Sequence, residues 1–155
     1  MKMPDIIGSE MLAPCGINCC VCYKHTKTRK HSQRCSGCLA GDSGKTERCR
    51  SCRIKICAQS KGISRCFECA DFPCRLIKNI DKSYIKRYGI SLIENGRAAH
   101  RDGIRQFLDQ DRIKWICPEC GGAFSLHDGF CSECGFSESP ADKAAENQNP
   151  QSDRN

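Results

Sequence analysis

Apolar side chains follow a helical period in residues 76–114. In the first part of this stretch they recur at spacings of three and four, which is the pattern of one helix face: Leu76, Ile77, Ile80, Tyr84, Ile85 and Tyr88. Gly89 is placed to end this helix. Residues 91–99 are also expected to be helical. A further apolar series, at positions 104, 107 and 108, follows Asp102, which suits a helix N-cap.

Residues 12–75 are loop-rich and are organised by cysteine instead. The chain holds 16 cysteines in 155 residues, about 10%, a share typical of a disulfide or metal scaffold. Twelve fall in this stretch, mostly as pairs separated by two residues, which can bind one metal ion with both sulfurs. A motif repeats with a period of 17 residues: Cys49-Arg-Ser-Cys52-x4-Cys57 and Cys66-Phe-Glu-Cys69-x4-Cys74.

The redox compartment separates metal ligands from disulfides. Residues 1–14 lack the pattern of a secretory signal, and no apolar run approaches the roughly 18 residues of a membrane span. We therefore expect a cytoplasmic location, where paired cysteines bind metal. Trp115 is the only tryptophan, so the core is expected to be thin. Because a structural zinc contributes about 10–16 kcal/mol, the metal-free first half is expected to be largely unfolded.

Residues 117–136 have the pattern of a zinc ribbon. Two pairs, each followed by glycine, stand ten residues apart: Cys117-Pro-Glu-Cys120-Gly and Cys131-Ser-Glu-Cys134-Gly. Glycine permits the positive φ that turns backbone N–H groups towards sulfur. Iron of the rubredoxin type fits the same four thiolates, but zinc is the commoner occupant. The Ser, Pro, Asn and Gln-rich tail, residues 137–155, is expected to be disordered.

The spacing of the twelve N-terminal cysteines allows two groupings. One joins Cys19/Cys22 with Cys35/Cys38 and Cys49/Cys52 with Cys66/Cys69, leaving Cys15, Cys57 and Cys74. The other makes one site of Cys57, Cys66, Cys69 and Cys74. Three thiolates without a fourth would form an open site, unless Cys20 or a histidine completes it or one thiol is simply buried.

Catalysis finds little support in the sequence. Cys15-x3-Cys19-x2-Cys22 has the cysteine spacing of radical S-adenosylmethionine enzymes, but no alternating strand–helix pattern follows. An iron–sulfur cluster without that fold remains an alternative to zinc in this module. His25 and His31 lie in a basic stretch and are expected to be exposed. His127 lies within the ribbon loop, and His100 lies on an expected helix without an evident partner. With no Cys–His or Ser–His–Asp arrangement, a non-catalytic role is favoured.

The formal charge of +7 divides unevenly along the chain. It is +8 over residues 1–75, +4 over residues 76–116 and −5 over residues 117–155. Each metal ion on four thiolates adds about −2, so four such sites would bring the chain near −1. Much of the basic excess is thus expected to balance thiolates. Nucleic-acid binding through the basic stretch 24–34 is a weaker alternative, with these side chains as candidates: Lys24, Lys27, Arg29, Lys30 and Arg34.

Several motifs in order resemble a cysteine-rich family of bacterial and archaeal proteins of unknown function, presumed to bind zinc. They are Ala13-Pro-Cys15-Gly-Ile-Asn-Cys19-x2-Cys22-Tyr23, Cys35-Ser-Gly-Cys38, Cys52-Arg-Ile-Lys-Ile-Cys57-Ala, Cys66-Phe-Glu-Cys69-Ala-Asp-Phe-Pro-Cys74-Arg-Leu and Tyr88-Gly-Ile-Ser-Leu-Ile-Glu-Asn95. The resemblance covers about residues 12–136. It implies these metal ligands: Cys15, Cys19, Cys22, Cys35, Cys38, Cys49, Cys52, Cys57, Cys66, Cys69 and Cys74. Cys20 is an addition to the family pattern.

The sequence therefore predicts a small metal-stabilised α+β protein. Its expected parts are a loop-rich cysteine module (12–75), a helical segment packed on it (76–116), a zinc ribbon (117–136) and a disordered tail (137–155). The expected role is that of a multi-zinc binding or adaptor module with a protein partner. The alternatives are an iron–sulfur or open-site redox protein or enzyme, and a nucleic-acid-binding protein.

Overall fold

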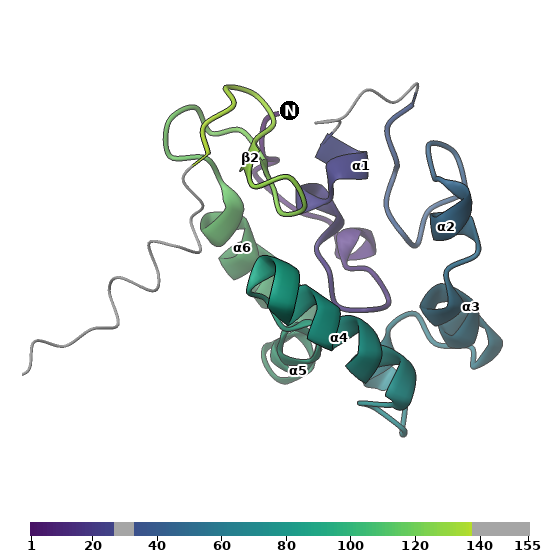
Figure 1. The fold of residues 1–155 in the computed structure, drawn as a ribbon. Helices are drawn as coiled ribbons and strands as arrows, with labels where there is room; N and C mark the ends of the chain where they lie inside the picture. The colour runs from purple at the N-terminus through teal and green to yellow at the C-terminus, as the bar shows by residue number, and fades with distance from the viewer. Residues whose placement is uncertain (27–32, 138–155) are drawn as a thin grey trace, which may run out of the picture.

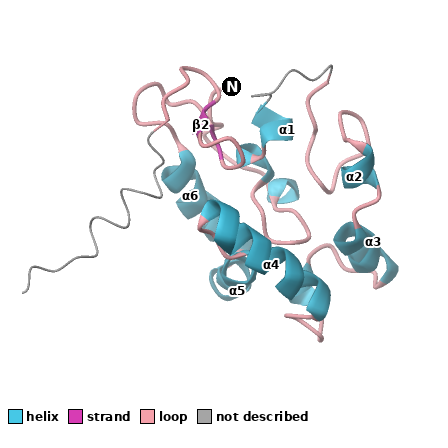
Figure 2. Ribbon diagram, viewed as in Figure 1, coloured by secondary structure: helices cyan, strands magenta, loops and turns pink. Residues whose placement is uncertain are grey.

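The structure, a computed structural model, describes residues 1–26 and 33–137. Its elements are the short 3-10 helices η1 (Ser9–Met11), η2 (Cys19–Val21) and η3 (Cys66–Glu68), the helices α1 (Tyr23–Thr26), α2 (Glu47–Arg50), α3 (Arg53–Ser60), α4 (Arg75–Tyr88), α5 (Leu92–Asp102) and α6 (Ile104–Trp115), and the strands β1 (Phe124–Ser125) and β2 (Phe130–Cys131). Figure 1 shows α2 and α3 at the side of the molecule away from β2, and α4 crossing the lower part of the view towards α3. Long loops join the short elements of the cysteine module (Figure 2).

The three long helices arise where the apolar period predicts them. Gly89 ends α4 with φ 65°, a left-handed conformation that glycine adopts without strain. Ser91 caps α5, because its Oγ accepts a hydrogen bond from the backbone N–H of Glu94 at 3.1 Å. The prediction of Asp102 as the N-cap of the next helix is wrong. Asp102 is the last residue of α5, and Gly103, at φ 87°, makes the sharp turn into α6.

One hydrophobic core joins the N-terminal segment, the helices and the ribbon. Its buried members come from residues 3–21 and 90–131, and six of them have no exposed surface: Leu12, Ala13, Leu92, Leu108, Ala123 and Phe124. Residues 33–74 contribute no fully buried member to this cluster. This part of the chain therefore depends less on apolar packing than the rest, as expected of a segment organised by cysteine.

The extreme N-terminus pairs with the ribbon, a contact between residues more than 100 positions apart. The backbone N–H of Met3 donates to the carbonyl of Gly121 at 3.1 Å, and that of Ala123 donates to the carbonyl of Met1 at 2.8 Å. Within the ribbon, β1 and β2 form an antiparallel hairpin in which Phe124 faces Cys131. The sequence analysis gave residues 1–11 no role, whereas the structure makes residues 1–3 an edge of the ribbon.

The start of the basic stretch 24–34 is folded into the protein. Lys24 is only 4% exposed, within the single turn of α1, so the prediction of a solvated nucleic-acid contact at this residue is wrong. His25 is half-buried, and its Nδ1 lies 2.7 Å from the carbonyl oxygen of Cys35, so its expected exposure is also wrong. Lys27, Arg29, Lys30 and His31 lie outside the described residues. Over the described part of the chain, no helix has the length and apolarity to cross a membrane.

Candidate metal centres

Four cysteines of the C-terminal hairpin gather into one cluster. The Sγ atoms of Cys117, Cys120, Cys131 and Cys134 all lie within 4.8 Å of one another. The Sγ atoms of Cys117 and Cys134 are 3.7 Å apart, and those of Cys120 and Cys131 are 3.6 Å apart. A disulfide bond would need about 2.05 Å. A tetrahedron with metal–sulfur bonds of about 2.3 Å has edges of about 3.75 Å. The cluster therefore has the size of a four-thiolate metal site.

Tight turns after each cysteine pair hold these sulfurs in place. Gly121 and Gly135 adopt φ 69° and 76°, as the two predicted knuckles require. Gly122 lies against the cluster, since a Cβ built there would meet the sulfur of Cys131 at 2.7 Å. The backbone N–H of Glu133 points at the same sulfur, at 3.4 Å.

The electrostatics of the cluster favour a thiolate. Burial raises the pKa of Cys120, but hydrogen bonds from Cys134 and from the backbone N–H of Gly122 outweigh it and lower the value to about 7. Burial raises the pKa of the Cys117 thiol. Because the thiolate is the form that binds metal, this lowering of the Cys120 pKa favours metal binding.

The first two cysteine pairs of the N-terminal module form a second set of thiols. Its members are Cys19, Cys22, Cys35 and Cys38. The backbone N–H of Cys38 donates to the sulfur of Cys19 at 3.3 Å, which joins the two pairs. The N–H of Gly37 lies 3.4 Å from the sulfur of Cys35, two residues before it. This repeats the contact between Glu133 and Cys131 in the ribbon, so both pairs bend in the same way.

Two lysines, Lys45 and Lys55, lie close to Cys38 in this second set. The hydrogen bond with Cys19 is the largest influence lowering the pKa of Cys38 to about 7, and the charges of Lys45 and Lys55 act in the same direction. Lys45 is buried, and its Nζ donates to the carbonyl oxygen of Cys38 at 3.1 Å. For Cys22, burial raises the pKa to about 12, and the charges of Cys38, Cys35 and Cys49 add to it. These thiols are therefore electrostatic neighbours.

A third set of thiols forms around Cys66. Burial raises its pKa to about 12, and further increases come from nearby thiols, in decreasing order Cys74, Cys57, Cys69 and Cys52. Lys61 places its Nζ 3.3 Å from the sulfur of Cys69 and 2.6 Å from a carboxylate oxygen of Asp71. Over the described residues, the sulfurs of the second and third sets are more widely spaced than those of the ribbon, since neither set brings three ligand atoms within 4.8 Å of one another.

Cys15 and Cys20 differ in their surroundings. Burial raises the pKa of Cys15, and the next contributions include Cys38, Cys52 and Cys66, so it lies between the second and third sets. Cys20 is 2% exposed, and after burial the charges acting on it are those of Glu10 and Asp111 rather than of thiols. The structure therefore gives no support to Cys20 as a fourth ligand for the remaining cysteines. It is a core residue.

The residues between the first cysteines shape the backbone. Asn18 caps η2, because its Oδ1 accepts from the N–H of Cys20 at 3.0 Å. Gly16 adopts φ 95°, and its carbonyl accepts from Nδ2 of Asn95 on α5 at 3.1 Å. The carbonyl of Pro14 accepts from the N–H of Cys66 at 2.8 Å. The motif Ala13–Tyr23 is thus tied both to α5 and to the third set of thiols.

An aromatic cluster connects the ribbon loop to the helices, a contact that the sequence analysis missed. Nε2 of His127 lies 3.0 Å from the hydroxyl of Tyr84 on α4. The imidazole also makes edge contacts with the rings of Tyr23 and Tyr88, at centroid distances of 5.2 and 5.1 Å. His100 stacks on Phe67. The helical period marked Tyr84 and Tyr88 as core positions, but nothing in it identified a histidine 40 residues away as their neighbour.

Comparison with known proteins places the cysteine module but assigns no activity. Residues 11–79 match a family described as "Protein of unknown function (DUF3795)". This stretch includes all twelve N-terminal cysteines and ends within α4, so it covers the first part of the expected resemblance and leaves out the ribbon. No curated protein and no solved structure matches the chain.

Proposed function

We propose that this protein is a multi-zinc binding module in which thiolate-bound metal holds two loop-rich regions in place. The observation that carries the proposal is the ribbon cluster, whose four sulfurs already have the spacing of a tetrahedral site. Four thiolates leave no open position for substrate. Such a site is structural, and zinc is its commonest occupant.

Two further closed sites are proposed in the N-terminal module. The first uses the second set of thiols, Cys19, Cys22, Cys35 and Cys38, because a backbone hydrogen bond joins its two pairs. The other uses Cys57, Cys66, Cys69 and Cys74. Of the thiols that raise the pKa of Cys66, the three with the largest effect are Cys74, Cys57 and Cys69. Cys15, Cys49 and Cys52 then remain as thiols between or beside the sites. Residues 33–74 need these metals most, since none of their few buried apolar side chains belongs to the hydrophobic core cluster.

The proposed role follows from what such metals do. Closed sites fix loops and the elements that the loops carry, and so present a rigid surface to a partner. The module is thus an adaptor rather than an enzyme, held together by three metal ions.

The deciding experiment is elemental analysis with a visible spectrum on protein purified without oxygen and without a metal-binding tag. We expect about three zinc per chain and no visible band. Iron with sulfide and a broad band near ~400 nm would instead establish the iron–sulfur alternative. Two substitutions distinguish the two possible groupings of the cysteines around Cys66 and Cys69. Cys57→Ser should remove one zinc while Cys49→Ser retains all three; the reverse result would establish the site made of Cys49, Cys52, Cys66 and Cys69.

A further inference from the structure

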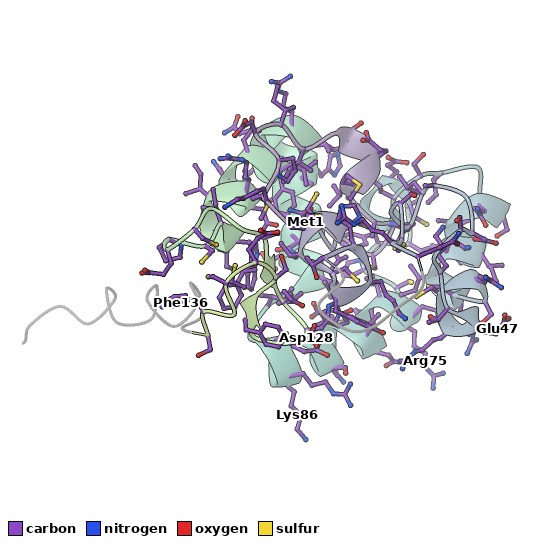
Figure 3. All side chains as sticks on the ribbon, turned by 90° about the horizontal axis from the view of Figure 1, so that it is seen from above. Met1, Glu47, Arg75, Lys86, Asp128 and Phe136 are labelled. Atoms are coloured by element: carbon purple, nitrogen blue, oxygen red, sulfur yellow. The ribbon has the colours of Figure 1, made fainter. Side chains whose placement is uncertain are left out.

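The exposed face of α4 carries a row of positive side chains. Arg75, Lys78, Lys82 and Lys86 are spaced by three or four residues, so they share one helix face. All four are exposed. They extend over about 16 Å, at 1.5 Å per residue. In Figure 3, Arg75 and Lys86 lie along the same edge of the molecule and point outwards. We call these four residues the α4 basic row.

The α4 basic row differs from the other basic residues nearby because its charges are not neutralised within the described residues. On α5 and α6, Arg97 pairs with Glu94 at 2.6 Å, Arg101 with Asp102 at 2.7 Å and Arg105 with Asp109 at 3.9 Å. No ion pair with a described residue involves any member of the row. A solvated surface helix commonly mixes both signs, so this row is unusual.

The acidic residue of α4 does not cancel the row. Asp81 is 7% exposed, and one of its carboxylate oxygens accepts hydrogen bonds from Ser91 Oγ at 2.9 Å and from the N–H of Ile93 at 3.1 Å. Its charge is thus engaged at the start of α5. The lysines that contact the thiol sets are different ones, Lys45 and Lys61. Neutralisation of thiolates therefore accounts for those lysines but not for the row.

A hollow lies along the first half of the row. Its volume is about 420 Å³, and its lining combines three cationic groups with an amide, a carboxylate and an apolar side chain: Arg75, Lys78, Asn79, Asp81, Lys82 and Ile93. Guanidinium, ammonium and amide N–H groups all donate to phosphate oxygens, and Arg can do so with two parallel bonds. The hollow therefore has the donors that a phosphate group needs.

We propose that the α4 basic row binds the phosphate backbone of a single-stranded nucleic acid. Four cations at intervals of about 5–6 Å suit a chain of repeated phosphates better than one small anion. Three of the four are lysines, which act as point charges on phosphates, and Arg75 can donate two parallel hydrogen bonds to a phosphate. This inference names a partner for the proposed adaptor and rests on its metal sites only for an intact fold.

The test measures binding of a labelled 12-nucleotide RNA, and of DNA of the same sequence, to the metal-loaded full chain by fluorescence anisotropy. The test variant is Lys78→Ala/Lys82→Ala/Lys86→Ala, which keeps good helix formers on an exposed face. The matched control is Arg97→Ala/Arg101→Ala/Arg105→Ala, which removes the same charge from residues that are ion-paired. Metal content is determined for every sample.

The salt dependence gives the expected numbers. With four phosphate contacts on a single strand, affinity should fall about 50-fold between 50 and 200 mM salt, and only about threefold when one contact remains. The control should keep the steep dependence. Equal weakening in both variants, no binding by the metal-loaded wild type, or equally strong competition by polyglutamate would overturn the inference. If the protein retains its zinc in any of these cases, only the nucleic-acid inference is rejected and the proposed multi-zinc module still holds. A wild-type protein without metal would instead reject the multi-zinc module. A preference for RNA or for DNA would identify the source of the phosphates.

Discussion

Cys134→Ser tests the ribbon site more cleanly than any other exchange. Cys134 is exposed, whereas Cys117 and Cys131 are buried. Replacing its sulfur by oxygen therefore opens no cavity in the core and leaves the hairpin backbone unchanged. If the four sulfurs held no metal, this substitution at an exposed position would be nearly neutral, within about 0.5 kcal/mol.

The metal predicts a much larger effect. A structural zinc contributes about 10–16 kcal/mol, so one of four equal ligands accounts for about 2.5–4 kcal/mol. In a chain of this length each kcal/mol lowers the melting temperature by about 2–4 °C. Cys134→Ser should therefore lower the melting temperature by roughly 5–16 °C and weaken zinc binding at the ribbon, so that a chelator removes from the variant one zinc per chain that the wild type keeps.

Trp115 reports on this site because it is the only tryptophan, is 3% exposed and packs on Phe124 of the hairpin, with ring centroids 6.4 Å apart. When the ribbon opens, the tryptophan fluorescence should shift to longer wavelength, while most of the helical circular dichroism of α4 and α5 is retained. The matched control is Cys20→Ala, which removes a buried sulfur that has no thiol among its charged neighbours. It should cost about 1 kcal/mol and leave the zinc content unchanged. The reasoning is refuted if Cys134→Ser protein keeps its zinc and its melting temperature.

Two further predictions concern the first cysteine motif and the core beside it. Gly16→Ala should destabilise the protein by about 2–4 kcal/mol in urea unfolding, because φ is 95° and the new Cβ would lie 2.6 Å from a backbone carbonyl oxygen of α5. The control Gly62→Ala, with φ 67° and open space around the new Cβ, should cost only about 1 kcal/mol, and equal losses in the two variants would contradict this account. Burial raises the pKa of Asp111 above 3.8 although Asn18 and Trp115 donate hydrogen bonds to it, so its carboxyl ionises at lower pH in the unfolded chain than in the folded protein. The stability of the wild type relative to Asp111→Asn should therefore fall as pH rises from about 4 and level off once the folded carboxyl is ionised. A stability difference that grows with pH would contradict this prediction.

Local patterns in the sequence were sufficient wherever the interacting residues are close along the chain. The period of α4 and its end at Gly89 are properties of consecutive residues, and the structure confirms both. The four ribbon cysteines meet because a hairpin with two glycine turns brings both pairs together whatever surrounds it. Asp102 shows the limit of local reasoning. Aspartate is a good N-cap residue, but the N-cap of α6 is Gly103, because glycine adopts the φ of 87° that the turn between the two packed helices requires without strain.

Charge and burial were decided by tertiary structure. Cysteine spacing identified metal ligands as a class, but spacing does not state which loops lie side by side, so the separation of Cys20 from the thiols and the neighbours of Cys66 appeared only in the fold. The net charge hid the α4 basic row, because a sum does not record which cations have partners. Pairing of the N-terminus with the ribbon joins residues more than 100 positions apart. The sequence by itself determined the ligand types and the helices, through short-range geometry, whereas only three-dimensional packing decided which ligands meet and which charges remain exposed.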